Sequence, residues 1–230
     1  TIAGVMLARK GLAPPVGSLT QLGTIRLGKR TDKRAPLIRD LVPLASLDAI
    51  EFGAWDIFPD TAFEAACQAA VLERQHLEAV RAELEAITPM KAVFYQEYVP
   101  RLRGTHLFDG ASKADAVEKV RSDIRQFKAS RGVDRVVVVW CASTETFLEP
   151  TPLHDNVASF EGALSRNDPA ISPSQIYAWA SMKEGVPFAN GAPNLGVDFG
   201  AAVELAREMA TPIAGKDFKT GQTLMKTVIA

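Results

Sequence analysis

One stretch of the chain, residues 133–140 (VDRVVVVW), limits the possible folds more than any other. Its unbroken run of β-branched residues lacks the alternation of apolar and polar positions that marks a strand with one solvated face. Such a run is typical of a parallel sheet that is covered by helices on both faces. We therefore expect an α/β fold in which this strand is buried on both sides.

Short apolar segments alternate with longer helical patterns along the rest of the chain. The apolar spacing predicts helices over residues 1–9, 61–87, 112–128, 155–165, 174–183 and 201–209. Further strands are predicted within residues 15–22, 48–57, 91–95, 186–189 and 212–214. This order indicates βα repeats and a mostly parallel sheet.

Composition and charge exclude several classes of protein. A formal net charge of -1 and a pI near 6.3 argue against a nucleic-acid binder, which normally carries a basic excess. The two cysteines, Cys67 and Cys141, are too few for a disulfide framework or a zinc site. No apolar run approaches the roughly 20 residues that cross a bilayer, and there is no signal-peptide pattern. We expect no nucleic-acid or membrane partner and a cytoplasmic location.

Residues 215–227 (GKDFKTGQTLMKT) follow a short apolar segment and predict a tight turn that opens into a helix. Thr220 fits the N-cap position, and the free amides of a helix N-terminus favour an anion. Asp217 adds an acid beside two cations, Lys216 and Lys219, a combination suited to proton transfer next to a phosphate. The alternative is a solvated loop with an ordinary helix cap.

In a parallel sheet, ligands bind outside the carboxyl ends of the strands. Besides residues 215–227, three other segments follow predicted strands: Trp55-Asp56, residues 141–145 (CASTE) and residues 190–194 (NGAPN). Asp56 could accept hydrogen bonds from a ribose or cap the helix that follows. Residues 141–145 could pack against a flat cofactor or form an ordinary turn.

Five segments resemble motifs of the myo-inositol-1-phosphate synthase family. Residues 217–223 (DFKTGQT) are similar to its Asp-(Phe/Leu)-Lys-Ser-Gly-Gln-Thr element, and residues 54–57 (AWDI) to Gly-Trp-Asp-Ile. Residues 140–145 (WCASTE) resemble Trp-Thr-Ala-Asn-Thr-Glu, with Cys141 and Ser143 as departures. The other two are residues 186–194 (VPFANGAPN), in which Ala192 replaces a serine, and residues 17–21 (GSLTQ). Their order over nearly the whole chain is most similar to the archaeal and bacterial branch.

The resemblance implies a Rossmann-like α/β fold, mostly parallel and with helices on both faces of the sheet. Residues 1–215 would form the NAD-binding domain, and residues 216–230 would begin a catalytic and tetramerisation domain. Asp217 is then expected to be catalytic. The residues expected to bind NAD are Asp56, Val93, Cys141, Ala142, Ser143, Thr144, Asn190, Gly191, Asp217 and Thr220.

The activity that the resemblance implies is conversion of D-glucose 6-phosphate to myo-inositol 1-phosphate (also numbered 3-phosphate), a step of inositol and phospholipid biosynthesis. It combines NAD-dependent oxidation at C5, intramolecular aldol cyclisation and re-reduction. A homotetramer is expected, and a divalent or monovalent cation is left open as a second cofactor. The family's glycine-rich loop would precede Thr1 and its catalytic lysines would follow Ala230, so we expect the 230 residues alone to be inactive. An NAD-dependent dehydrogenase of another substrate and a non-catalytic dinucleotide-binding module are the alternatives.

Overall fold

The computed structural model describes residues 2–14 and 23–217, which fall into two compact units. The first unit comprises Thr1–Trp55 and Pro59–Met90, and the second comprises Asp56–Phe58 and Lys91–Ala230. The chain passes from one unit to the other at a short two-stranded sheet, β1 (Trp55–Asp56) and β2 (Met90–Lys91). The strands predicted within residues 48–57 and 91–95 are thus reduced to two residues each. The segments 15–22 and 218–230, with their predicted strand and helix start, lie outside the described residues.

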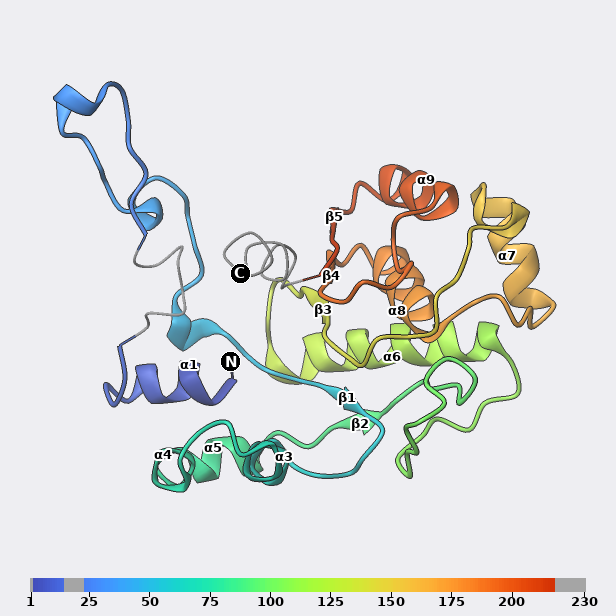
Figure 1. Ribbon diagram of the computed structural model, residues 1–230, viewed down its shortest axis with the longest axis horizontal. Coiled ribbons are helices and arrows are strands. Elements are labelled where there is room, and N and C mark those ends of the chain that lie inside the picture. Colours follow the sequence, from blue (N-terminus) through green and yellow to red (C-terminus); the bar gives the residue numbers. More distant parts are fainter. Residues whose placement is uncertain (1, 15–22, 218–230) are drawn as a thin grey trace, which may run out of the picture. The chain divides into compact units, whose positions relative to one another are not determined.

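The first unit is helical. Its α-helices are α1 (Ile2–Arg9), α3 (Ala62–Ala69), α4 (Arg74–Glu78) and α5 (Arg81–Glu85) (Figure 1). Three single 3₁₀ turns accompany them: η1 (Arg30–Asp32), η2 (Ile38–Asp40) and η3 (Leu47–Ala49). The helices enclose one small core of buried residues: Ala3, Met6, Leu7, Phe63, Leu77, Val80, Leu84 and Ile87.

The prediction of one helix over residues 61–87 is wrong, because the structure divides this segment into α3, α4 and α5. Helix α3 ends where Ala70 takes a left-handed conformation (φ 50°), and Val80 (φ -126°, ψ 22°) separates α4 from α5. Neither break contains glycine or proline, so no local signal marks it. The breaks allow Phe63, Leu77 and Leu84 to reach the same core. In a single straight helix Phe63 and Leu84 would lie on nearly the same face but about 31 Å apart along the axis.

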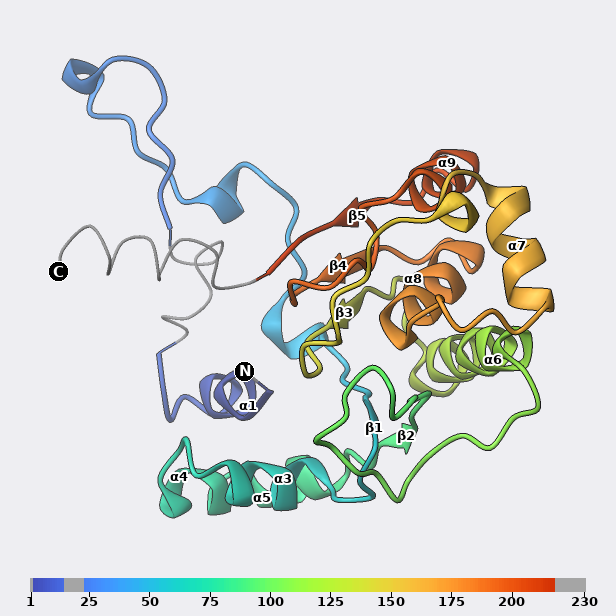
Figure 2. The same ribbon diagram turned by 45° about the vertical axis from the view of Figure 1, so that its right-hand side comes forward.

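The second unit contains a parallel sheet in the order β3 (Val138–Trp140), β4 (Phe188–Asn190), β5 (Ile213–Ala214). The connection from β3 to β4 ends with helix α8 (Pro173–Lys183), and α9 (Gly200–Glu208) connects β4 to β5. Successive right-handed βαβ connections that add strands in the same direction place their helices on the same face of a parallel sheet. Figures 1 and 2 show α8 and α9 on one face of this sheet. Helices α6 (Lys113–Arg131) and α7 (Val157–Ser165) and the 3₁₀ turn η4 (Pro152–His154) complete the unit.

Helix α8 is the centre of this unit, since every residue from Pro173 to Met182 is buried. Ser172 caps its N-terminus in a reciprocal capping box with Gln175, and Pro173 occupies the first turn. Trp179 packs against Phe160 of α7 with ring centroids 4.4 Å apart. A helix that is buried around its whole circumference must be enclosed on all sides, and α6, α9 and the sheet surround it.

Burial of residues 133–140 on both faces is not what the structure shows. Val138 is buried against the helices, whereas Val137 and Val139 are 60% and 49% exposed, and only residues 138–140 form a strand. The described helices of this unit cover a single face of the sheet. The wider prediction of an α/β chain with a parallel sheet and helices is confirmed.

The remaining helix predictions hold to within a few residues, and Ser112 and Gly132 cap α6 at its two ends. In the described part of the chain, no helix has the length and apolar character needed to span a membrane.

Candidate functional site

Three segments meet at the carboxyl edge of the β3-β4-β5 sheet. Trp140 lies beside Asn190 in the parallel register, and the Gly191 N–H donates to the Trp140 carbonyl oxygen at 2.8 Å. On the other side of β4, a Cβ atom added to Gly215 would lie 3.0 Å from the Asn190 Cβ, so glycine permits this close approach. The sheet therefore brings residues 141–145, 190–194 and 215–217 to one edge, the place where ligands of such sheets bind.

The segment that follows β3 is exposed over four residues and then turns inward. Cys141, Ala142, Ser143 and Thr144 are all exposed, whereas Glu145 is 8% exposed. Small side chains and hydroxyls at this position leave room for a flat ligand and offer it hydrogen bonds. The segment fits a dinucleotide cofactor on this ground.

Glu145 attaches this segment to the N-terminus of α8. One carboxylate oxygen accepts from the Ser174 N–H at 2.8 Å and the other from the Ser174 hydroxyl at 2.6 Å. Burial raises the pKa of the Glu145 carboxyl above its ordinary value, while the hydrogen bonds from Ser174 and Ser172 act in the opposite direction. A carboxylate at a helix N-terminus also meets the positive end of the helix dipole. Glu145 is thus a buried anchor of the segment.

Asn190 shapes the turn after β4 with its own side chain. Its Oδ1 accepts from the Ala192 N–H at 3.1 Å, and its Nδ2 donates to the Asn194 carbonyl oxygen at 2.9 Å. The residue is 2% exposed, whereas Gly191 is partly exposed. Asn190 therefore holds the loop, and Gly191 is its more accessible neighbour.

Asn194 connects the two loops. Its Oδ1 accepts from the Glu145 N–H at 3.0 Å, and the residue is 5% exposed. Within residues 2–14 and 23–217, its Nδ2 has no hydrogen-bond partner, and the same is true of the buried Trp140 Nε1. Neither Glu145 nor Asn194 is among the site residues predicted from the sequence, although both lie within segments that resemble the family's motifs.

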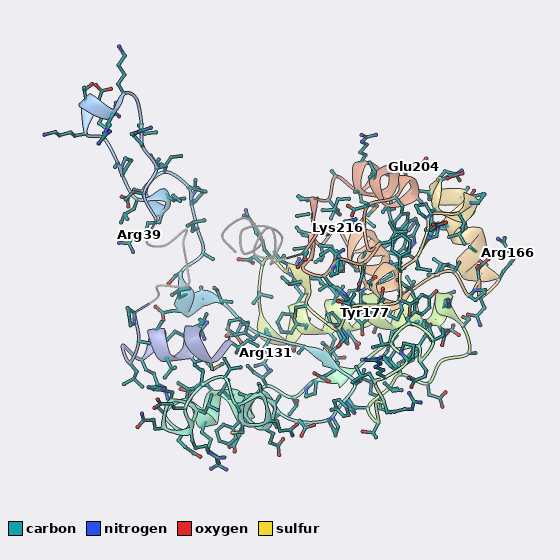
Figure 3. The ribbon with its side chains drawn as sticks, in the orientation of Figure 1. Arg39, Arg131, Arg166, Tyr177, Glu204 and Lys216 are labelled. Carbon is teal, nitrogen blue, oxygen red and sulfur yellow. The ribbon has the colours of Figure 1, made fainter. Side chains whose placement is uncertain are left out.

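Asp217 lies two residues beyond the contact between Gly215 and Asn190. It is partly buried and adopts a left-handed conformation (φ 66°), which aspartate tolerates better than most residues. Its neighbour Lys216, which lies beyond the end of β5 (Figure 3), pairs with Asp198 at 3.1 Å. Thr220, the other candidate of this motif, lies outside the described residues.

Tyr177 of α8 interacts with Val93, with Asp56 and with Trp140 at the end of β3. The Val93 N–H donates to the Tyr177 hydroxyl oxygen at 2.9 Å, and the Tyr177 ring centroid lies 5.3 Å from that of Trp140. Burial raises the pKa of Tyr177, and the Asp56 carboxylate contributes in the same direction. Asp56 is exposed, and its Oδ1 accepts from the Phe58 N–H at 3.0 Å. The Val93 backbone is therefore engaged within the protein, and Asp56 keeps an accessible carboxylate.

Metal ligands are not grouped in the described residues, where no set of three or more His, Cys, Asp and Glu side chains could hold a metal ion. At the sheet edge, amides and hydroxyls can donate hydrogen bonds, and two carboxylates from separate loops can accept them. Such a set suits an organic ligand with many hydrogen-bonding groups.

Comparisons with known proteins agree on one family. The NAD-binding model described as myo-inositol-1-phosphate synthase matches residues 1–230. Inositol-3-phosphate synthase 1 of Bacteroides thetaiotaomicron is 50% identical over 230 residues, which are 100% of this chain and 53% of that protein. Inositol-3-phosphate synthase 1 of Oryza sativa subsp. japonica is 35% identical over 99% of this chain and 47% of its own length.

A solved structure shows the same likeness in three dimensions. The crystal structure of inositol-3-phosphate synthase from Caenorhabditis elegans superposes with a TM-score of 0.85 at 28% identity, covering 97% of this chain and 47% of that one. The chain therefore spans about half the length of the curated relatives that it matches.

Proposed function

The chain belongs to the myo-inositol-1-phosphate synthase family, and from this premise we propose that it is the NAD-binding part of an enzyme that converts D-glucose 6-phosphate to myo-inositol 1-phosphate. The curated relatives are named inositol-3-phosphate synthase, which denotes the same product under another numbering. Residues 216–230 begin the second, catalytic and oligomerisation domain in this proposal. The full-length enzyme is a cytoplasmic homotetramer.

The observation that carries the proposal is the meeting of three strand-end segments at one sheet edge. Asn190 contacts Gly215 on one side and lies beside Trp140 on the other, so residues 141–144, 190–191 and 215–217 can face a single ligand. Bound NAD supplies a hydride acceptor for the oxidation and a hydride donor for the final reduction. The exposed loop after β3 and the Asn194 NH₂ group, which has no partner within residues 2–14 and 23–217, are the features of this chain that fit such a cofactor.

Each segment has a different part in holding the ligand. Cys141, Ala142, Ser143 and Thr144 pack against the cofactor and offer hydroxyl and backbone hydrogen bonds. Gly191 allows the backbone to approach it closely, since a side chain there would narrow the space. Asp56 accepts from ribose hydroxyls, and Thr220 binds the cofactor or a phosphate.

Asp217 acts as a proton carrier beside the nicotinamide. It is a carboxylate on the segment next to Asn190, it is partly buried, and Lys216 beside it is engaged with Asp198. A carboxylate in this place accepts the proton that leaves as the sugar hydroxyl is oxidised and returns it when the ketone is reduced. Because the proton is returned, the residue ends the cycle in its starting state.

The proposal is tested with Asp217→Asn in the full-length protein, by measuring inositol phosphate formed from glucose 6-phosphate. Turnover should fall by about 10²–10⁴-fold while NAD remains bound, because the amide cannot accept the proton. Asp134→Asn is the matched control, since Asp134 is exposed and precedes β3 at the opposite edge of the sheet.

Near-normal turnover of Asp217→Asn would remove Asp217 from the mechanism. Net release of NADH by the wild-type protein, without inositol phosphate, would show a dehydrogenase instead of a synthase.

A further inference from the structure

The orientation of the Asn194 side chain is set by its environment. The Glu145 N–H can only donate, so the group that meets it at 3.0 Å must be the Asn194 Oδ1. The opposite orientation would place the NH₂ group against that N–H. The NH₂ group is therefore the free end of the side chain, in a residue that is only 5% exposed.

A buried NH₂ group without an acceptor is rare in folded proteins. More than nine in ten buried polar groups have a partner, and an unpaired one costs the free energy of its lost hydration. Among the described residues the Asn194 Nδ2 has no such partner. It lies on a loop at the carboxyl edge of the sheet, where ligands bind, so an acceptor on the ligand would complete its hydrogen bonding.

The neighbouring charge indicates which kind of acceptor fits. Asn194 is bonded to the backbone of Glu145, whose buried carboxylate lies in the same cluster. A phosphate beside this carboxylate would be repelled, and poorly hydrated like charges repel strongly. A neutral carbonyl oxygen meets no such penalty and matches a neutral amide donor.

We propose that the Asn194 NH₂ group donates to the carboxamide oxygen of the bound nicotinamide, and that Glu145 positions it. This inference rests on the proposed function, which places the nicotinamide beside Asp217 on the adjoining segment. It adds two residues to those that the sequence motifs indicate.

Asn194 is held from two sides. The Glu145 carboxylate is fixed by two hydrogen bonds to Ser174 at the start of α8, the most deeply buried helix of the unit. The Asn190 Nδ2 holds the Asn194 carbonyl oxygen at 2.9 Å. A donor that is fixed in this way loses little entropy when the ligand binds. Glu145 is accordingly a positioning residue that makes no contact with the ligand itself.

The first test is Asn194→Asp in the full-length protein, because aspartate keeps the acceptor for Glu145 and replaces only the NH₂ group. Binding of NAD and of ADP-ribose, which lacks the nicotinamide, is measured by isothermal titration calorimetry. The affinity for NAD should fall by about tenfold or more, and that for ADP-ribose should stay within about twofold. Asn156→Asp is the matched control: Asn156 is the exposed N-cap of α7, and its Oδ1 accepts from the Ser159 N–H.

The inference would be overturned if Asn194→Asp bound NAD with the wild-type affinity. It would also be overturned if the variant lost affinity for NAD and for ADP-ribose to the same extent. Absence of NAD binding by the wild-type protein would overturn the proposed function, and this inference with it.

A second pair of variants keeps the test valid if aspartate at position 194 prevents folding. Glu145→Ala should lower the preference for NAD over ADP-ribose, because Asn194 loses its fixed position, and Glu145→Gln should restore part of that preference. Asn194→Ala should lower the same preference by about tenfold. If either residue had a purely structural role, its substitution would weaken the binding of NAD and of ADP-ribose alike. The ratio of the two affinities would then stay unchanged, which would contradict the inference.

Discussion

The two units of the chain stabilise their helices in different ways. In the second unit, α8 is buried from Pro173 to Met182, and its capping Ser172 is fully buried as well. In the first unit, α4 and α5 have five residues each and carry surface ion pairs, Arg74–Glu78 and Arg81–Glu85. Isolated helices of this length are unstable in water, so those of the first unit depend on one small core.

This difference matters for the site. The loop residues that could meet a ligand are anchored to α8 through Glu145 and Ser174, and the anchors are shielded from water. A hydrogen bond in such surroundings fixes geometry more firmly than one on the surface, where water competes. The buried helix therefore serves the site as a rigid support.

The largest effect is expected from Trp179→Ala. Trp179 is 1% exposed and packs against Phe160, so its loss leaves a cavity at the centre of the second unit. The free energy of unfolding should fall by about 3–5 kcal/mol, measured by urea unfolding followed by circular dichroism. Val71→Ala in the first unit is the control, because Val71 is 83% exposed and its loss should change the value by less than about 0.5 kcal/mol. A loss below about 1 kcal/mol for Trp179→Ala would show that α8 is not the centre of stability.

The capping boxes of α8 and α3 give a sharper comparison of the units. Ser172→Ala removes a buried cap of α8, and Thr61→Ala removes a half-buried cap of α3, which pairs with Glu64. The free energy of unfolding, measured in the same way, should fall by about 1–2 kcal/mol for Ser172→Ala and by about 0.5–1 kcal/mol for Thr61→Ala. Water can replace the lost bond at Thr61 but not at Ser172. Equal losses would mean that burial of the cap does not matter.

His154 predicts a pH dependence that comes from the second unit. It is 1% exposed, its Nδ1 accepts from the Thr151 N–H, and burial lowers its pKa below the ordinary 6.5. The unfolded chain therefore binds the proton more readily, so the stability from this residue is complete above pH 6.5 and is lost as the pH falls through the folded pKa. Between pH 7 and pH 5, the free energy of unfolding should fall less for His154→Gln than for wild type, as measured by unfolding curves. An unchanged slope for His154→Gln would refute the assignment.

The smallest effect is expected from Glu85→Gln, which breaks an exposed ion pair on α5. The Arg81 Nε lies 2.7 Å from the Glu85 Oε1, and both side chains are about half exposed (51% and 44%). Exposed pairs contribute little and are screened by salt. The change in unfolding free energy should be smaller than for Thr61→Ala and should vanish in high salt. A loss as large as that of Ser172→Ala would contradict the contrast between the units.

The sequence predicted the features that depend on local signals. The extent of α6 follows from the capping Ser112, the terminal Gly132 and the apolar spacing between them. The divisions of residues 61–87 could not be predicted, because Ala70 and Val80 carry no signal for a break and only the shared core requires one. In the same way, Val137 and Val139 suit a buried strand by composition, and only the one-sided placement of α8 and α9 leaves them exposed.

By itself the sequence determined the family, the α/β class and the strand-end segments of the candidate site, because motifs, periodicity and caps act over a few neighbouring residues. Tertiary structure alone decided that Glu145 is buried against Ser174 and that the Asn194 NH₂ group has no partner among the described residues. A glutamate or asparagine in a loop has the same local chemistry whether it is solvated or enclosed. Its surroundings, which come from distant parts of the chain, decide whether it holds a site together.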